Sequence, residues 1–278
     1  MFRDLLETFG FYDIFIVDPE DGYILYSVFK EVDFGTSLLM GPYKDSNFAA
    51  AYRMVMQNPK PGTAILVDFE PYEPSYNAPA AFIAAPIFER RELVGVAIFQ
   101  MPINRINSIM TSNQSWGNVG LGKSGETYIV GEDFRMRNQS RFLIEDSESY
   151  FAAIQDSGAP TETVKLIKAF NSTVGLQKVE TKGTIAALSG QTSTETFPDY
   201  RNVPVLSAYR PLTRQGMSWS LMPEIAASEA FASVVALKRR ILILITILLE
   251  SIIGISFVFA KKMTRPIKIL TAKAESLA

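Results

Sequence analysis

The segment with the strongest signs of a binding site is a short run of carboxylates, phenols and prolines. It reads Asp-Phe-Glu-Pro-Tyr-Glu-Pro-Ser-Tyr and covers residues 68–76. Binding pockets have a mostly apolar wall with a few fixed polar groups, and tyrosine side chains supply both. The two prolines restrict the backbone and would hold these groups in place. The segment predicts part of a ligand pocket, although a rigid surface loop would have the same composition.

Polar and aromatic residues from earlier segments could complete this pocket. They lie on and after a predicted strand and at the start of a predicted helix. The full candidate ligand-binding set is Tyr26, Lys30, Asp33, Tyr43, Asn47, Asp68, Tyr72, Ser75 and Tyr76. Lys30 and Asp33 could instead be ordinary solvated charges.

The composition excludes several kinds of chemistry. The chain has no cysteine and no histidine. Disulfides, thiolate nucleophiles, Cys/His zinc sites and imidazole acid–base catalysis are therefore excluded. We predict no catalytic residue, no metal site and no cofactor. The formal net charge of −2 leaves no basic footprint for nucleic acid.

One glycine-rich stretch, residues 117–124, matches the phosphate-loop pattern G-x-x-x-x-G-K-S. That loop needs a strand before it and a helix after it, so that the helix N-terminus faces the phosphate. Here the preceding residues are polar and the following Thr-Tyr-Ile-Val predicts a strand. We interpret the glycines as a flexible lead into the next module.

Three arginines, Arg135, Arg137 and Arg141, cluster beside Glu132 and Asp133. Such a cluster could bind a carboxylate or phosphate ligand. Ion pairing at the protein surface is favoured, because most charges of this kind lie in solvent.

The elements that would position these residues occur twice in the same order. In the first module they are strands at 12–18, 23–29 and 63–69, a helix at 46–57 and a hairpin at 81–101. A helix at 102–112 follows. In the second module they are strands at 126–130 and 134–138, a helix near 161–170, weak strands at 183–188 and 193–197, and a closing hairpin at 203–222. The repeated order predicts a duplicated α+β fold, with an antiparallel sheet and helices in each module.

Residues 241–260 are apolar except for one ionisable side chain, Glu250. A helix of this length spans about 30 Å, the thickness of a bilayer's hydrocarbon core. We predict a transmembrane helix, the alternative being a buried core helix. Residues 228–237 predict a helix that runs into the span. More basic residues follow the span than precede it, which places the tail in the cytoplasm.

The two ends of the chain carry further expectations. Residues 1–9 have neither the apolar core nor the cleavage site of a signal peptide. We expect that the true N-terminus, with a first membrane span, is missing, unless the span itself translocates the N-terminus. At the other end, Ile267, Leu270, Ala274 and Leu277 have heptad a/d spacing, which predicts a helix that pairs with another helix in a homodimer.

Three separated motifs resemble the double Cache sensor family of prokaryotic transmembrane receptors. They are FYDIFIVDPEDGYILYSVFKEVDFGTSL at 11–38, APAAFIAAPIF at 78–88 and GKSGETYIVGEDFRMRNQSRFL at 122–143. The tail, residues 259–278, resembles the start of a HAMP linker, with Pro266 as its opening proline. The resemblance implies two PAS-like modules outside the membrane, with ligand bound in the distal one.

The chain departs from that family in two ways. The long helix that normally precedes the first module is absent. The Arg-x-Trp signature of the amino-acid-binding branch is also absent, because residues 47–61 contain no tryptophan. An amino-acid ligand is therefore not supported.

These observations predict the sensing half of a dimeric inner-membrane receptor that binds a small molecule and relays to a HAMP linker. The expected parts are a distal module at 1–101, a linker helix and proximal module at 102–225, a juxtamembrane helix at 226–240, the transmembrane helix at 241–260 and the HAMP start at 261–278. Residues 1–240 would lie in the periplasm or outside the cell. The output could be a chemotaxis domain, a kinase or a cyclase. The alternatives are a membrane-tethered enzyme and an adhesive ectodomain.

Overall fold

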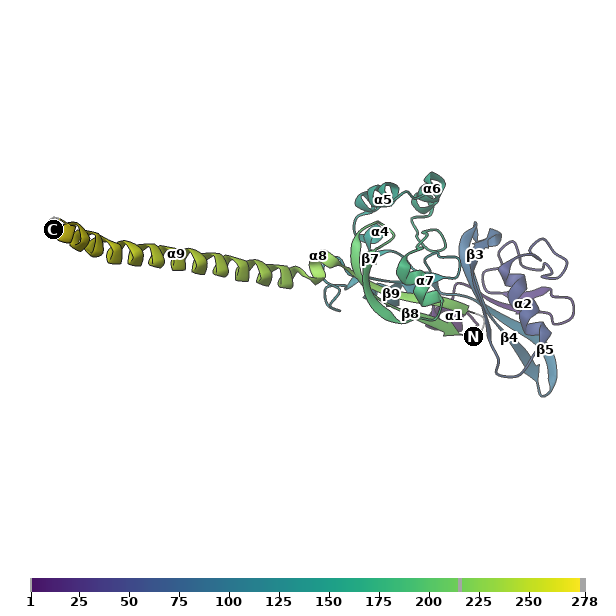
Figure 1. Cartoon of the computed structure of the whole chain (residues 1–278). Coiled ribbons are helices and arrows are strands. Elements are labelled where there is room, and N and C mark those ends of the chain that lie inside the picture. Colours follow the sequence, from purple (N-terminus) through teal and green to yellow (C-terminus); the bar gives the residue numbers. More distant parts are fainter. Residues whose placement is uncertain (1, 215–216, 276–278) are drawn as a thin grey trace. The chain divides into compact units, whose positions relative to one another are not determined.

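The computed structural model describes residues 2–214 and 217–275. The chain divides into two compact units, residues 1–227 and 228–278. The first unit contains two antiparallel sheets, each with its own helices (Figure 1). This mixed α+β architecture of two sheets, followed by an apolar helix, is the predicted fold class.

The first sheet has five strands in the order β2-β1-β5-β4-β3, and every neighbouring pair is antiparallel. Its elements are α1 (Phe2–Phe9), β1 (Ile14–Val17), β2 (Ile24–Ser27), α2 (Asn47–Gln57), β3 (Ile65–Tyr72), the 3-10 turn η1 (Glu73–Ser75), β4 (Ala78–Glu89) and β5 (Glu92–Gln100). Helix α2 begins where the Ser46 hydroxyl accepts a hydrogen bond from the Ala49 N–H. Its apolar side buries Phe48 against Phe15 and Phe82 of the sheet.

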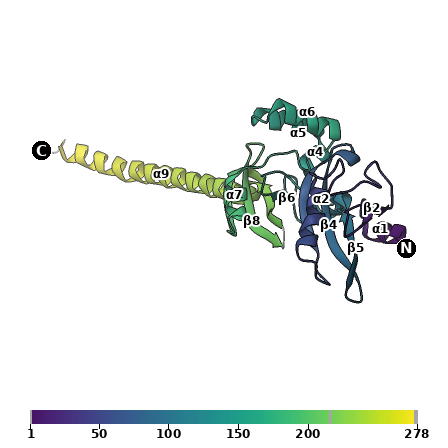
Figure 2. The ribbon, with the colours of Figure 1, turned by 90° about the vertical axis from the view of Figure 1, so that its right-hand side faces the viewer.

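The second sheet has four strands in the order β6-β9-β8-β7. Its elements are α3 (Ile103–Met110), the 3-10 turn η2 (Ser112–Gln114), β6 (Glu126–Gly131), α4 (Arg141–Glu145), α5 (Ser147–Asp156), α6 (Thr161–Phe170), α7 (Lys182–Leu188), β7 (Ser193–Pro198), β8 (Pro204–Arg214) and β9 (Met217–Ala226). Helices α4, α5 and α6 follow one another as a packed group (Figure 2). The predicted closing hairpin is β8 and β9, whose turn lies partly outside the described residues.

A third apolar cluster joins the two sheets. Phe69 of β3 stacks on Trp219 of β9, with ring centroids 6.4 Å apart, and Met110 of α3 and Ile129 of β6 belong to the same cluster. The two modules therefore share buried side chains within one unit.

Two predicted strands of the second module are wrong. Residues 183–188 form α7, because the side chains of Thr181 and Thr184 cap each other's backbone N–H groups and start a helix there. Residues 134–138 form isolated bridges, Val130 with Met136 and Arg135 with Lys178, in the part of the chain that the structure describes. A tight turn with Phe134 at φ 58° precedes these bridges and breaks the ladder.

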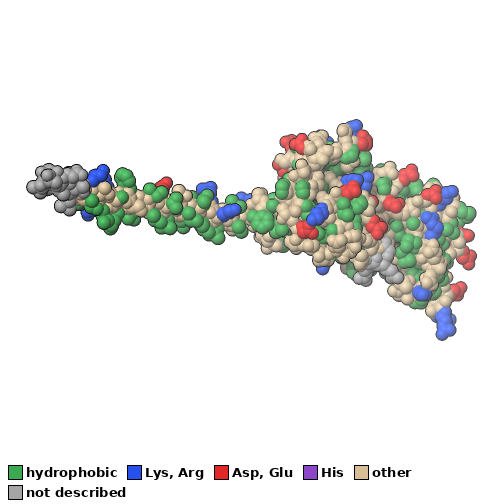
Figure 3. Space-filling model, viewed as in Figure 1, with side chains coloured by type: hydrophobic (Ala, Val, Ile, Leu, Met, Phe, Trp, Pro, Cys, Tyr) green, Lys and Arg blue, Asp and Glu red, His purple; other side chains and the backbone are tan. Residues whose placement is uncertain are grey.

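The second unit consists of the end of α8 (Ala227–Ala230) and the 44-residue α9 (Ala232–Glu275). Within the described ranges, α9 is the one helix long and apolar enough to cross a membrane, and none of its apolar window is buried. Apolar side chains cover its surface between basic residues (Figure 3). The predicted juxtamembrane helix starts at α8, breaks at Phe231, and then continues with the span and the tail as one helix that includes Pro266. Leu277 lies outside the described residues.

Candidate functional site

A pocket of about 680 Å³ lies in the first module, at the end of the sheet where β1 begins and β5 ends. Three aromatic residues, Phe11, Tyr12 and Phe29, line it together with Leu6, Met101 and Ile103. Its polar lining includes Glu31, Ser75 and Gln100. No basic side chain lines it among the described residues. The wall is therefore largely apolar and aromatic, with one carboxylate.

The polar groups of this pocket form one network. The Tyr12 hydroxyl donates to Glu31 Oε1 at 3.0 Å, and the Ser75 hydroxyl lies 3.5 Å from Glu31 Oε2. Gln100 Nε2 donates to Ser75 Oγ at 3.3 Å. Gln100 is 4% exposed, and its buried Oε1 has no hydrogen-bond partner in the part of the chain that is described. An amide oxygen buried in this way is available to a donor from a ligand.

The backbone holds these side chains in register. The Tyr12 N–H donates to the Gln100 carbonyl at 3.2 Å, which ties the start of β1 to the end of β5. Ser75 is the last residue of η1, and Glu31 follows β2 in the chain. Four separate segments thus converge at one end of the sheet.

A second buried carboxylate, Asp33, lies close to this network. The Tyr72 hydroxyl donates to Asp33 Oδ2 at 2.6 Å, while Asp33 Oδ1 is buried without a partner among the described atoms. Burial raises the pKa of Asp33 and that of Glu31, and charge repulsion from neighbouring carboxylates adds to both rises. The hydroxyls of Tyr72 and Tyr12 oppose these pKa shifts by hydrogen bonding. A positively charged group nearby would stabilise both carboxylates.

Several predicted site residues come together. Asp33, Tyr43 and Tyr72 form one group, with the rings of the two tyrosines 6.2 Å apart, and Ser75 lines the pocket. Asn47 is buried nearby, and its Nδ2 donates to the carbonyls of Asp68 and Ala80. It braces β3 against β4 where their register shifts.

Other predicted residues lie away from the pocket lining. Tyr76 is 86% exposed. Lys30 is exposed, with its Nζ 5.5 Å from the centroid of the Phe34 ring. Tyr26 packs against Phe2, with ring centroids 5.1 Å apart.

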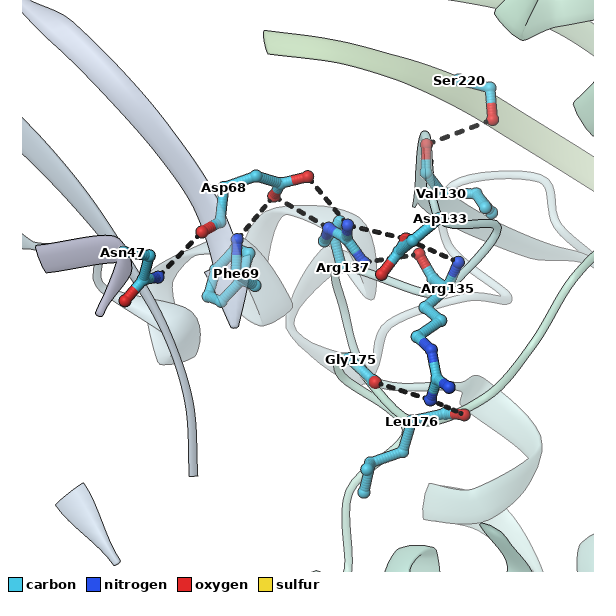
Figure 4. Close-up of polar contacts among 10 residues, drawn as sticks. All are labelled: Asn47, Asp68, Phe69, Val130, Asp133, Arg135, Arg137, Gly175, Leu176 and Ser220. Atoms are coloured by element: carbon cyan, nitrogen blue, oxygen red, sulfur yellow. Dashed lines mark hydrogen bonds and ion pairs between the residues drawn. The ribbon is translucent and has the colours of Figure 1, made fainter. Parts of the chain in front are cut away.

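Asp68 points into the second module, where it pairs with Arg137 (Figure 4). Arg137 Nε donates to Asp68 Oδ1 at 2.9 Å, and Nη2 donates to Asp68 Oδ2 at 2.8 Å. Nη2 also donates to Asp133 Oδ1 at 2.8 Å. Two parallel bonds to one carboxylate make a strong and directional contact.

The predicted surface ion pairing is wrong for Arg137 and Arg141, since their side chains are 2% and 6% exposed. Arg141 pairs with Glu145, lies over the Trp116 ring and donates to the carbonyls of Gly122 and Gly125. Arg135 is exposed and donates to the carbonyls of Gly175 and Leu176 (Figure 4). All three guanidinium groups therefore bond to protein atoms.

The glycine-rich stretch is followed by strand β6, as predicted. Its carbonyls at Gly122 and Gly125 face the Arg141 guanidinium. A phosphate loop needs N–H groups at a helix N-terminus at this point, whereas a strand follows here.

Tyr12, Glu31 and Gln100 line the pocket but are missing from the predicted set. Gln100 had a detectable signal, because this polar residue ends β5 directly after the run Leu-Val-Gly-Val-Ala-Ile-Phe at 93–99. Tyr12 and Glu31 had no such signal. Tyr12 lies just before β1 and Glu31 lies in the loop after β2, and only the fold brings these two segments together.

No family model and no curated protein matches this chain. Solved structures with a similar fold include the ligand-binding domain of the Pseudomonas fluorescens chemoreceptor CtaA in complex with L-leucine, with a TM-score of 0.47 and 11% identity over 82% of this chain and 75% of that chain. They also include the ligand-binding domain of the Pseudomonas aeruginosa PAO1 chemoreceptor PctB in complex with L-Arg. Its TM-score is 0.47, with 15% identity over 83% of this chain and 79% of that chain. A third is the periplasmic sensory domain of the Campylobacter jejuni chemoreceptor Tlp1. Its TM-score is 0.47, with 13% identity over 79% of this chain and 73% of that chain. Their names describe ligand-binding or sensory domains of chemoreceptors.

Proposed function

We propose that this chain is the sensing and transmembrane signalling portion of a bacterial receptor, and that its first module binds a small organic cation. The observation that carries the proposal is the pocket at Glu31 and Gln100, in a unit whose last strand, β9, is followed in the chain by α8 and then by the unburied apolar helix α9. The chain acts as a sensor rather than as an enzyme.

The pocket chemistry favours a cation. Glu31 lines the pocket as its one carboxylate, with the charge of Asp33 close behind it. Gln100 Oε1 is an acceptor without a partner among the described atoms, and aromatic rings form part of the wall. Ammonium groups bind well between carboxylates, carbonyl oxygens and aromatic faces. An amino acid would also bring a carboxylate, which would have no basic partner among the described lining residues.

A path for the signal follows from the contacts between the modules. Asp68 of β3 is bonded to Arg137, whose backbone N–H donates to the Ile129 carbonyl of β6. Strand β6 pairs with β9, and β9 ends at Ala226, one residue before α8. A ligand that binds one packing of the first module better than another shifts the population of that packing, and these contacts pass the change to the helix.

The orientation follows from charge. Five basic residues follow the apolar span at positions 261, 262, 265, 268 and 273, and three precede it at positions 238–240. We place residues 1–240 outside the inner membrane and residues 261–278 in the cytoplasm. The tail pairs with a second copy through its heptad positions and leads to a HAMP linker.

Binding to the full chain in lipid nanodiscs tests the proposal. Two matched pairs of compounds, ethanolamine with glycine and choline with glycine betaine, differ chiefly in whether a hydroxymethyl group or a carboxylate accompanies the ammonium. We expect a compound without a carboxylate to raise the melting temperature, and at a hundredfold excess over Kd the gain is about 2.7 kcal/mol. Its carboxylate counterpart should give no shift.

Variants locate the site. Glu31→Gln should lower the affinity for the ammonium compound at least tenfold, a loss of about 1.4 kcal/mol. Glu20→Gln is the control, because Glu20 is exposed and does not line the pocket. Equal binding of both members of each pair, or unchanged affinity in Glu31→Gln, contradicts the proposed ligand class.

A further inference from the structure

Two buried glutamates face each other in the second module, on strands far along the chain from the pocket. Glu126 of β6 and Glu224 of β9 are direct partners in the antiparallel ladder, and they are 3% and 5% exposed. The Cβ atoms of such partners lie about 5 Å apart on the same face of a sheet. Two carboxylates thus share one side of a protein core.

Their surroundings differ. Glu126 Oε1 accepts from the Ser140 hydroxyl and the Arg141 N–H, both at 2.7 Å, and Oε2 accepts from the Tyr200 hydroxyl at 3.0 Å. Glu224 Oε1 is buried and has no partner among the described atoms.

Two further polar atoms in the same core, Tyr128 Oη and Ser207 Oγ, are also buried without partners among the described residues. Tyr128 lies two positions along β6 from Glu126, and Ser207 of β8 is the ladder partner of Glu224. Buried polar atoms without a good hydrogen bond are rare in folded proteins, and each needs a physical explanation. Both hydroxyls lie close enough to Glu224 to oppose the rise in its pKa as weak donors, but no charged partner faces this carboxylate among the described residues.

The pair is therefore expected to hold one charge and one proton. Three donors stabilise the ionised form of Glu126, while a second charge beside it in the core is strongly disfavoured. Burial raises the pKa of Glu224 to about 8; hydrogen bonds from the Tyr128 and Ser207 hydroxyls oppose this rise, and the charges of Asp199 and Glu126 add to it. Burial also raises the pKa of Glu126, opposed by its hydrogen bonds and by the Arg201 charge.

The titratable and charged groups that act on Glu224 come from β6 and from the loop before β8. They are Glu126 and Tyr128 from β6 and Asp199 from the loop before β8, while Arg201 is paired with Asp199 and acts on Glu126. The buried residues of α7, which packs against β9, are the uncharged Gly183, Thr184 and Ala187. No cation therefore pairs with Glu224 among the described residues.

Glu224 also lies close in the chain to α8 and α9, which together are called the output helix here. It is two residues before the end of β9 at Ala226, and α8 begins at Ala227. The Ala226 N–H donates to the Ser124 hydroxyl at 3.1 Å, which fixes this strand end. Repulsion between two ionised glutamates would act directly on this strand end.

We propose that the second module is a proton sensor in its own right, in which loss of the proton held between Glu126 and Glu224 repacks the end of β9 and displaces the output helix. The ligand of this site is a proton from the extracytoplasmic solution. This response to the proton does not require a ligand in the first module.

A single fluorescent label tests this inference. The chain has no cysteine, so an exposed Ser228→Cys can be labelled uniquely in the full chain in nanodiscs. As the pH rises through the range from about 6 to about 10, the emission should change with a midpoint near the pKa of Glu224, about 8. Glu224→Gln, which keeps the shape without the charge, should abolish the change.

A second variant separates proton binding from a structural role. Glu126→Gln removes the facing charge, so the midpoint should move to lower pH while the transition persists. Glu162→Gln, on exposed α6, is the matched control and should leave the midpoint unchanged. A transition that persists in Glu224→Gln, or the same midpoint in Glu126→Gln, overturns the inference. Should Glu224→Gln fail to fold, the Glu126→Gln midpoint decides alone.

Discussion

At the residue scale, Asp68 and Arg137 are 69 positions apart, and no local pattern connects them. Asp68 belongs to a segment with the composition of a pocket, and Arg137 to a cluster of charges of the kind usually found in solvent. Only the packing of β3 against the second module brings them into contact. A carboxylate's neighbours in sequence therefore do not reveal its partner.

Asp68→Asn should destabilise the first unit. The substitution leaves the buried Arg137 guanidinium with Asp133 as its remaining carboxylate among the described contacts. Loss of one partner of a buried charged group costs about 1–3 kcal/mol. Urea unfolding of the full chain checks this, with Asp45→Asn, at an exposed position, as the control. Equal unfolding midpoints for the two variants would rule out a structural contribution from the pair.

Glu224 makes stability depend on pH with a definite sign. Its folded-state pKa of about 8 lies above its ordinary value of 4.5, so the folded chain holds this proton more tightly than the unfolded chain does. This contribution is fully present below pH 4.5 and is lost as the pH rises to 8. The slope is at most about 1.4 kcal/mol per pH unit.

Chemical unfolding at a series of pH values measures this dependence. The difference in unfolding free energy between wild type and Glu224→Gln should fall across that window and level off above it. A difference that stays constant with pH would show that Glu224 has the same pKa in both states.

At the element scale, local patterns predicted most strands and helices because alternation and helical spacing record which face is buried. They failed at α7, where the sequence Lys-Gly-Thr-Ile-Ala-Ala-Leu has no clear period and the Thr181–Thr184 capping box decides the outcome. The pocket was predicted only in part, since Ser75 comes from a recognisable segment whereas Tyr12, Glu31 and Gln100 meet through the fold.

Gly183→Ala in α7 should destabilise the second module, the reverse of the usual effect of alanine in a helix. Alanine normally favours a helix over glycine by about 1 kcal/mol. Here a methyl group would press on the Phe197 ring and lie 2.8 Å from Met222 Cε. Overpacking of this kind costs about 1–3 kcal/mol. Thermal unfolding should show a lower melting temperature for Gly183→Ala, and no loss for Gly117→Ala, where the methyl group meets open space.

At the scale of the whole molecule, the proposed topology rests on α9, which is long and apolar enough to cross a membrane in the part of the chain that the structure describes. The length and uniformity of α9 were readable from sequence because a span needs a fixed number of apolar residues. The side on which each part lies depends on flanking charge, which is a weaker signal.

Thiol labelling in intact cells tests the orientation. A membrane-impermeant maleimide should label Ser228→Cys at once, whereas Lys268→Cys should react only after the inner membrane is permeabilised. The native chain contributes no background because it has no cysteine. Labelling of Lys268→Cys in intact cells would reverse the assigned topology.

The link between ligand and output helix can be measured in one experiment on the labelled Ser228→Cys chain in nanodiscs, titrated at constant pH with choline and ethanolamine. The account predicts a saturable change in emission for at least one of them, with a midpoint that Glu31→Gln moves at least tenfold higher and Glu20→Gln leaves in place. An ammonium compound that binds by calorimetry but leaves the emission unchanged, or that acts equally on the Glu31→Gln chain, would contradict it.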